Sequence, residues 1–177
     1  MAVVNSTIFQ IVGYQNSGKT TLIKHLIREL GKLGLTAVSI KHHGHGGAPS
    51  FNKEKDSFQH LKAGAIASIV EGDGHLLLQS QKSKWSIQEQ IQLLSFFQPD
   101  VILVEGHKKE IFPKAVIIRK REDLTLLDSL ENIKIVFYWE KDLIEKVENL
   151  KPYPFFHIND PDGFQWMVQN ITRWQSN

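Results

Sequence analysis

The chain has 177 residues, of which 41% are hydrophobic and 23% charged, a composition typical of a globular domain and unlike that of a disordered chain. The 21 lysine and arginine residues nearly balance the 19 aspartate and glutamate residues, so net charge predicts no nucleic-acid-binding surface. The sequence contains no cysteine, which excludes disulfides, thiolate metal sites and cysteine nucleophiles.

Neither a membrane span nor a targeting segment is visible in the sequence pattern. No stretch approaches the ~18 consecutive apolar residues that a membrane-spanning helix needs. The N-terminus lacks the basic region of a signal peptide. We therefore expect a cytoplasmic protein with no membrane contact. Because no repeat or linker composition interrupts the sequence, we expect a single domain over residues 1–177.

Short apolar runs alternate with helical patterns along the chain, which is typical of an α/β domain. The pattern predicts strands at residues 8–12, 36–40, 101–104, 115–118 and 133–138. It predicts helices at about residues 19–33, 56–63, 86–97 and 162–174, and a glycine-rich loop at residues 42–55. Two apolar runs at residues 66–70 and 75–78 flank a turn and predict a protruding β-hairpin.

The segment from Gly13 to Thr20 matches the P-loop pattern, in which two glycines five positions apart are followed by Lys and by Ser or Thr. It also follows a predicted strand and opens a predicted helix. Glycines let the backbone approach phosphate oxygens, and the loop N–H groups and the helix N-terminus then face the anion. Lys19 would reach the β- and γ-phosphates, and the Thr20 hydroxyl would bind Mg²⁺. The predicted nucleotide-binding residues are Gly13, Asn16, Ser17, Gly18, Lys19, Thr20 and Thr21.

A P-loop needs a second acidic group for Mg²⁺, usually at the end of a buried strand. Glu105 follows four consecutive apolar residues and is therefore expected at the carboxyl end of its strand, where α/β sheets bind ligands. The sequence predicts Thr20 and Glu105 as the Mg²⁺ ligands. The alternative for Glu105 is a solvated charge at the strand end. Asp100, at the opposite end of the strand, is interpreted as structural.

A histidine-rich cluster follows the predicted strand at residues 36–40 and should lie at the same edge of the sheet. Lys41, His42 and His45 are its candidate ligand-contacting residues. Three interpretations stay open: contact with the nucleotide or another anionic ligand, metal binding through imidazoles, or a plain polar loop.

Many GTPases combine a P-loop with an Asn-Lys-x-Asp motif whose carboxylate recognises guanine, and this sequence has no clear match to that motif. The stretch at residues 52–55 superficially suggests the guanine-reading Asn-Lys-x-Asp pattern, but Lys55 stands where the carboxylate is required. Asp142, which follows a late predicted strand, is a weak candidate, and a helix-capping role is its alternative. Trp139 is interpreted as a core or interface aromatic residue.

Taken in order, these motifs resemble the family of molybdopterin-guanine dinucleotide biosynthesis adapter proteins, MobB. The resemblance spans roughly residues 8–119, about two thirds of the chain. It is carried by the P-loop with Thr21 and Leu22, Lys41-His42 with His45, Asp56-Ser57 with Ala63-Gly64-Ala65, Val104-Glu105-Gly106-His107-Lys108 with Glu110, and Pro113-Lys114.

The resemblance implies a P-loop NTPase fold with a mostly parallel sheet flanked by helices, GTP and Mg²⁺ as cofactors, and a homodimer. It implies a partner, the guanylyltransferase MobA, which attaches GMP to molybdopterin, and contact with molybdopterin or its guanine dinucleotide. The phosphate loop, Glu105 and the Asp56 region would form the nucleotide site, with Lys108 as a further ligand contact. Hydrolysis in the family is weak, so the expected role is an adapter and at most a slow GTPase.

Two other functions are open from the residues alone. A small-molecule kinase would be expected to carry an arginine-rich lid, and the loop at residues 42–55 contains no arginine. A nucleotide-dependent metal-insertion chaperone is favoured if the histidine cluster binds nickel or zinc.

The predicted hairpin is apolar on both of its alternating faces, unlike a hairpin with one face in water. We expect it to contribute to a homodimer interface, and burial under the helix at residues 86–97 is the alternative.

Overall fold

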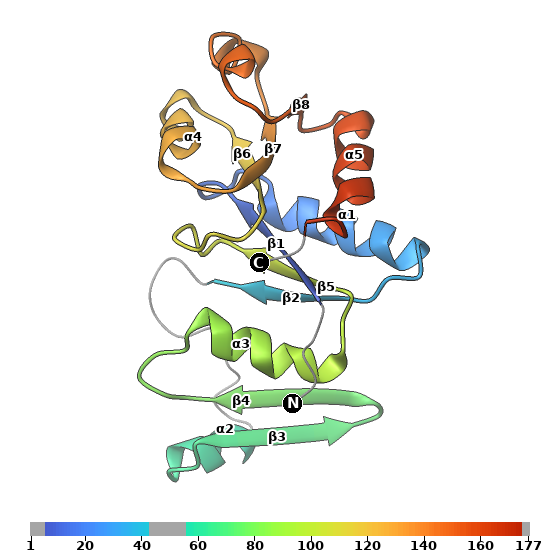
Figure 1. Ribbon diagram of the computed structural model, residues 1–177. Helices are drawn as coiled ribbons and strands as arrows, with labels where there is room; N and C mark the ends of the chain where they lie inside the picture. Colours follow the sequence, from blue (N-terminus) through green and yellow to red (C-terminus); the bar gives the residue numbers. More distant parts are fainter. Residues whose placement is uncertain (1–5, 43–55, 175–177) are drawn as a thin grey trace. The chain divides into compact units, whose positions relative to one another are not determined.

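The computed structural model describes residues 6–42 and 56–174, and the chain divides into two compact units (Figure 1). Unit 1 comprises Met1–His42 and Ile91–Asn177, and unit 2 comprises His43–Gln90. In the described part of the chain, no helix combines the length and the apolar character that crossing a membrane requires.

Unit 1 is built on a six-stranded sheet in which every neighbouring pair of strands is parallel. The spatial order is β2-β5-β1-β6-β7-β8 (Figure 1). The central strands are short apolar runs buried on both faces, which is what a parallel sheet covered by helices requires. The strands are β1 (Thr7–Val12), β2 (Ala37–Lys41), β5 (Val101–Glu105), β6 (Lys114–Ile118), β7 (Ile133–Tyr138) and β8 (Phe155–His157).

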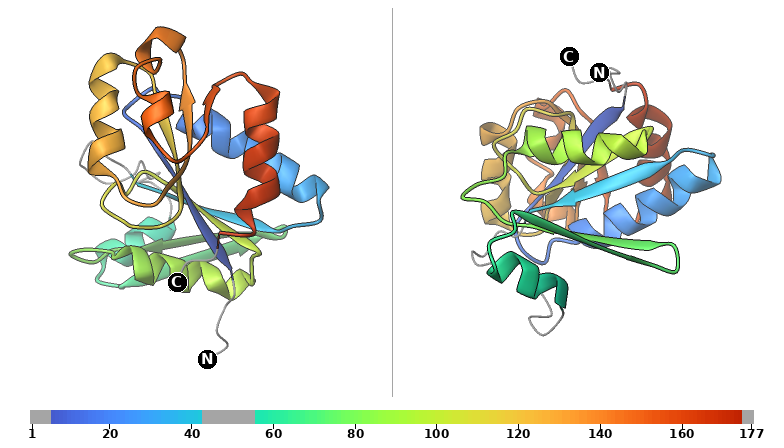
Figure 2. Two further views of the ribbon diagram at one scale, coloured as in Figure 1. Left: turned by 45° about the horizontal axis from the view of Figure 1, so that its top comes forward. Right: turned by 90° about the horizontal axis from the view of Figure 1, so that it is seen from below.

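One face of this sheet is covered by α1 (Lys19–Lys32) and α5 (Pro161–Ile171), which lie beside each other in both views of Figure 2. The leucines of α1 recur every four residues, so they form one apolar stripe. Leu26 and Met167 pack with Phe9 and Ile11 in a fully buried cluster. This packing fixes the axis of α1 and with it the position of the loop that precedes it.

The opposite face carries a smaller cluster, because side chains alternate between the two faces of each strand. Val116 and Val136 pack there against Leu126 and Leu127. The covering segments are η2 (Arg121–Thr125), which is a 3₁₀ helix, and α4 (Leu126–Ser129). Two more 3₁₀ turns, η3 (Lys141–Leu143) and η4 (Glu148–Leu150), precede β8. The predicted mostly parallel sheet with flanking helices is confirmed.

Unit 2 contains α2 (Asp56–Lys62) and a two-stranded antiparallel sheet of β3 (Ala67–Gly72) and β4 (His75–Ser80). The predicted hairpin is thus present. Its two central turn residues, Asp73 and Gly74, both have positive φ (51° and 74°), as the tight turns that favour hairpins require.

The helix expected at residues 86–97 is divided into α3 (Ile87–Leu94) and the 3₁₀ turn η1 (Ser95–Phe97). The Ser95 hydroxyl donates to the Ile91 carbonyl oxygen at 2.8 Å, an interaction that bends helices by competing with the backbone. Gln98 then adopts a left-handed conformation and ends the segment.

Candidate functional site

The phosphate loop lies between β1 and α1, as its motif predicted. A Cβ on Gly13 would lie 2.5 Å from the Ser17 hydroxyl oxygen, so no larger residue fits there without displacement. Gly18 has a φ of 104°, a left-handed conformation that glycine adopts at little cost. The two glycines of the motif therefore shape the turn that leads into α1, whose first residue is Lys19.

Lys19 is held across this loop, where its ammonium donates to the Tyr14 carbonyl oxygen at 2.7 Å. Partial burial lowers the pKa of Lys19; the nearby cations Lys108 and Lys41 also lower it, while Glu105 opposes them. The lysine therefore lies in a cluster of three cations around one carboxylate, an arrangement that favours a polyanionic ligand.

Glu105 is the last residue of β5 and is buried. Both of its carboxylate oxygens lie 3.1 Å from the Thr20 hydroxyl. Lys41, which pairs with Glu105 in the register of β2 and β5, lies 3.1 Å from the Thr20 hydroxyl oxygen and 3.4 Å from Glu105 Oε1. The two predicted Mg²⁺ ligands thus lie together beside an ammonium group. A hydroxyl and a carboxylate are oxygen ligands of the kind that Mg²⁺ takes, with waters completing its shell.

His42 and His107 lie at the same edge of the sheet, with ring centroids 4.7 Å apart. Burial lowers the pKa of His107, and the neighbouring His42 adds to this effect. The loop after β5 is held by the Gln10 amide, which donates to the carbonyl oxygens of residues 106 and 107 at 2.6 Å each. Lys108 places its ammonium 3.5 Å from the centroid of the Tyr14 ring, within the phosphate loop.

The structure brings together most, but not all, of the residues that the sequence predicted for this site. Lys41, His42 and Lys108 surround the phosphate loop and Glu105 in unit 1. Asp56 begins α2 in unit 2, so its expected place in the nucleotide site stays a prediction. His45 lies outside the described residues. Within the described part of the chain, no group of three or more metal-ligating side chains is present.

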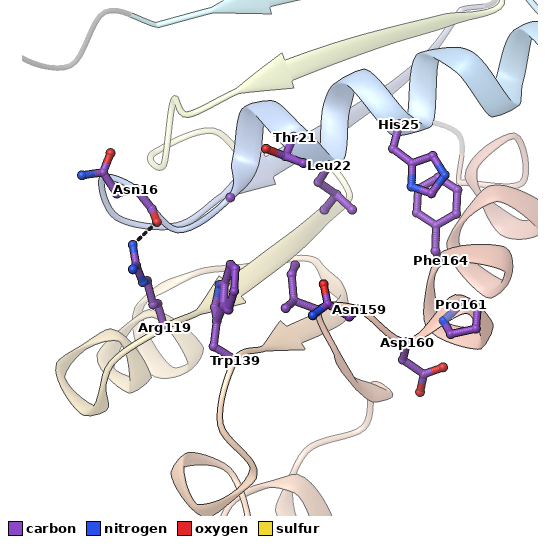
Figure 3. A pocket seen from close by; sticks show the side chains of 12 residues that line it. Asn16, Thr21, Leu22, His25, Arg119, Trp139, Asn159, Asp160, Pro161 and Phe164 are labelled. Carbon is purple, nitrogen blue, oxygen red and sulfur yellow. Dashed lines mark hydrogen bonds between the residues drawn. The ribbon is translucent and has the colours of Figure 1, made fainter.

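A pocket of about 560 Å³ adjoins the phosphate loop in unit 1 (Figure 3). One wall is formed by Trp139, whose indole N–H donates to the Ser17 carbonyl oxygen at 2.9 Å, and by Arg119, which donates to the Asn16 carbonyl oxygen. The pocket is lined by residues of the loop and α1 (Asn16, Gly18, Thr21, Leu22, His25), by Arg119 and Trp139, and by the segment leading into α5 (Ile158, Asn159, Asp160, Pro161, Phe164).

Sequence reasoning missed most of this pocket. Trp139 was expected in the core or at an interface, but its indole forms part of the wall beside the phosphate loop. Asp142 lies in η3 and is not among the lining residues. The position of residues 158–160 could have indicated a site, because they directly follow the last strand. Ligands of α/β sheets bind at the carboxyl ends of the strands.

A model of the family described as MobB, molybdopterin guanine dinucleotide synthesis protein B, matches residues 8–138. The chain is 36% identical to a Bacillus subtilis probable molybdopterin-guanine dinucleotide biosynthesis adapter protein over 165 residues, or 93% of this chain and 92% of the relative. It is 31% identical to the Escherichia coli adapter protein over 115 residues, or 63% of this chain and 65% of the relative.

Solved structures of the same family are also similar to this chain. The crystal structure of Bacillus subtilis MobB superposes with a TM-score of 0.77 at 37% identity, covering 92% of this chain and 96% of that one. The hydrogenase maturation factor HypB from Archaeoglobus fulgidus, at 15% identity and a TM-score of 0.50, shares the fold alone.

Proposed function

The chain belongs to the molybdopterin guanine dinucleotide synthesis protein B family, and on that premise we propose that it binds GTP with Mg²⁺ as an adapter in the synthesis of molybdopterin guanine dinucleotide. Its partner in this proposal is the guanylyltransferase MobA, which joins GMP to molybdopterin. The protein would act in the cytoplasm as a homodimer and contact molybdopterin or its guanine dinucleotide. The alternatives, a small-molecule kinase and a metal-insertion chaperone, gain no support from the relatives.

The observation that carries the nucleotide proposal is the contact between Thr20 and Glu105 at 3.1 Å, directly beside the phosphate loop. The loop amides and the Lys19 ammonium would bind the β- and γ-phosphates. When bound, Mg²⁺ would neutralise part of the negative charge of the phosphates. Thr20 and Glu105 would hold it, and Lys41 would move from their oxygens toward the phosphates.

The remaining residues of the cluster fit a binding role. Lys41 and Lys108 both lie close enough to Lys19 to lower its pKa, so an anion placed in the loop would relieve their mutual repulsion. Lys41, His42 and Lys108 would therefore contact the phosphates or the substrate of the partner enzyme.

A substitution in the phosphate loop tests the proposal. Lys19→Ala should abolish GTP binding while leaving the fold intact, because the side chain is only partly buried and contacts the loop rather than the apolar core. The measurement is equilibrium titration with a fluorescent GTP analogue, combined with capture of purified guanylyltransferase in the presence of GTP and Mg²⁺. Lys24→Ala, at an exposed position of the same helix, is the matched control. Unchanged affinity in Lys19→Ala would refute the phosphate site, and failure of the wild type to capture the enzyme would refute the adapter role.

A further inference from the structure

The pocket adjoins the phosphate loop, so the rest of a ligand whose phosphates occupy the loop would extend into it. Four residues of the loop and the first turn of α1, namely Asn16, Gly18, Thr21 and Leu22, also line the pocket. Its volume of about 560 Å³ falls within the roughly 300–1,000 Å³ of small-molecule sites. A nucleotide whose phosphates occupy the loop would therefore have room for its sugar and base in this pocket.

Trp139 forms a flat wall that is fixed against the loop. Its indole N–H donates to Ser17, and a Cβ on Gly18 would lie 3.5 Å from its Cζ2 atom. The Arg119 guanidinium lies 5.6 Å from the ring centroid. The residue is nevertheless 37% exposed and lines the pocket, so a ligand in the pocket can contact it. An anchored, partly exposed aromatic ring is the kind of group on which nucleobases stack.

The segment from Ile158 to Pro161 lines the pocket, and two contacts tie it to the end of β7 and to Trp139. Figure 3 shows Asn159, Asp160 and Pro161 of this segment. The Ile158 amide donates to the Tyr138 carbonyl oxygen at 2.8 Å, and the His157 ring nitrogen lies 3.0 Å from the Trp139 carbonyl oxygen. These contacts hold the segment in a defined position relative to Trp139. The backbone from which Asn159 and Asp160 project is therefore positioned before any ligand arrives.

The side chains of Asn159 and Asp160 have hydrogen-bonding capacity to spare. Among the described residues, the side-chain amide of Asn159 makes no hydrogen bond. Asp160 caps α5 by accepting from the Asp162 amide at 2.9 Å with Oδ1, which leaves Oδ2 and the second lone pair of Oδ1 able to accept two more hydrogen bonds. Both residues line the pocket, the Asn159 amide next to Trp139 and the Asp160 carboxylate farther along the segment (Figure 3). A rotation of the Asp160 side chain would bring an amide and a carboxylate to the rim of one flat ligand that carries both donors and acceptors.

We propose that this pocket binds the guanine base of the nucleotide, with Trp139 as the stacking surface and with Asn159 and Asp160 as the residues that recognise its edge. The inference rests on the proposed function and assigns its specificity. Guanine presents the N1–H and the N2 amino group as donors and O6 as an acceptor. A carboxylate accepts from both donors, and the Asn159 amide donates to O6. Adenine presents an unprotonated N1, which would face the carboxylate without a proton to share.

The decisive variant is Asp160→Asn, because asparagine caps helices about as well as aspartate and the change removes only the carboxylate. We expect GTP affinity to fall about tenfold or more. We expect the affinity for xanthosine triphosphate to rise, because xanthine has a carbonyl oxygen where guanine has the amino group, and the new side-chain amide can donate to it. Asp162→Asn and Asp142→Asn are matched controls on carboxylates that do not line the pocket, and both should bind GTP as the wild type does.

Three further variants, at two positions, keep the test independent of folding. Asn159 is exposed, so Asn159→Ala should fold normally and should weaken GTP about tenfold. Trp139→Phe keeps an aromatic surface but loses the hydrogen bond to Ser17, whereas Trp139→Ala loses both. We expect Trp139→Ala to lose more GTP affinity than Trp139→Phe.

Inorganic tripolyphosphate, which has no base, separates the two proposals. It should bind the wild type, Asp160→Asn and Asn159→Ala equally, and it should fail to bind Lys19→Ala. If the wild type binds neither tripolyphosphate nor GTP, the proposed function itself fails. If both bind but Asp160→Asn and Asn159→Ala retain full GTP affinity and the preference for GTP over ATP, the pocket does not recognise guanine.

Discussion

At the scale of single residues, two opposite charges lie beside the Thr20 hydroxyl. Glu105 contributes a buried carboxylate, and Lys41 contributes an ammonium 3.4 Å from it. A buried carboxylate needs a compensating cation, and the ammonium supplies one in this structure. Binding of Mg²⁺ at the same oxygens would replace one cation by another of higher charge density, so the carboxylate should control metal affinity more than phosphate affinity.

Glu105→Gln tests whether the carboxylate controls metal affinity separately from phosphate affinity. The variant should require about tenfold more Mg²⁺ for half-maximal GTP binding, because the amide loses the negative charge that attracts the metal. Binding in the presence of EDTA should change much less, since the loop amides are untouched. The measurement is a magnesium titration at fixed GTP concentration, with the exposed Glu145→Gln as control. Identical magnesium titrations for Glu105→Gln and the wild type would rule out the assigned role.

Lys114 is a second residue whose charged form is destabilised, in this case by burial. It is fully buried and donates to the carbonyl oxygens of Glu110 and Glu131 at 2.9 and 2.6 Å. Burial lowers the pKa of Lys114 to about 8, although the carboxylates of Glu110 and Glu131 oppose the shift. An unfolded lysine has a pKa of about 10.4. Between these values the unfolded chain binds a proton that the folded chain does not, so stability should rise with pH.

The predicted size of this effect is up to about 3 kcal/mol between pH 8 and pH 10.5, because each pKa unit corresponds to about 1.4 kcal/mol. Urea unfolding of the wild type and of Lys114→Met at several pH values isolates the contribution. The free energy of unfolding of the wild type should rise relative to that of Lys114→Met across this range. Parallel pH dependences in the two proteins would show that the pKa of Lys114 is not lowered by folding.

Local motifs made the phosphate loop predictable, but not the pocket beside it. The residues of the loop are contiguous, and Glu105 could be placed because a buried strand ends at it. Trp139 and Ser17 are 122 positions apart, and their hydrogen bond depends on β1, β6 and β7 being neighbours in the sheet. No local pattern in the sequence fixes the order of these strands. From the sequence alone, Trp139 therefore could not be distinguished from an aromatic residue of the core.

At the scale of elements, segments with a clear apolar pattern were predicted, and the three-residue strand β8 was not. The strands β1, β5, β6 and β7 and the helix α1 carry clear apolar runs or stripes. β8 has three residues, too few for an alternating pattern to be recognised, and it forms because β7 offers it a free edge. The segment that carries Asn159 and Asp160 follows β8, so missing this strand also concealed the polar side of the pocket.

The hairpin of unit 2 is the element whose apolar surface most needs a partner. Five of its apolar side chains are exposed, namely Ile69, Val70, Leu76, Leu77 and Leu78, and so is Ile66 just before β3. An isolated two-stranded hairpin is marginally stable in water, and an unpaired apolar edge promotes association. These observations support the proposal that the hairpin contributes to a homodimer, in which a self-complementary contact would cover this surface in both copies.

Charged substitutions test the hairpin interface. Leu76→Glu combined with Leu78→Glu places two charges on one face of β4 and should yield folded monomers at tens of micromolar protein. Analytical ultracentrifugation measures the oligomeric state, and circular dichroism checks the fold. Lys84→Glu, an exposed position outside the hairpin, should remain dimeric. A monomeric wild type, or a dimer that persists in the double variant, would contradict the interface.

At the scale of the whole molecule, the two units differ in their means of stability. Unit 1 has two buried apolar clusters on the faces of its sheet. Among the described residues of unit 2, Leu61 and Ile87 are the buried apolar side chains. So small an apolar core is insufficient for independent folding of a segment of this length. We therefore expect unit 2 to fold only together with the rest of the protein. On this expectation the chain is a single folding domain.

Calorimetry with bound nucleotide tests this expectation. The described residues of the phosphate site lie in unit 1, so a ligand that stabilises only unit 1 would move only its transition if the units unfolded separately. GTP and Mg²⁺ at 100 times the dissociation constant should add about 2.7 kcal/mol of stability, and the Tm should rise by about 5–10 °C. One transition that moves as a whole is the expected result, and Lys19→Ala should show no shift. Two transitions, of which one ignores the nucleotide, would mean that the chain contains two domains, because ligand binding can displace only the equilibrium to which it is coupled.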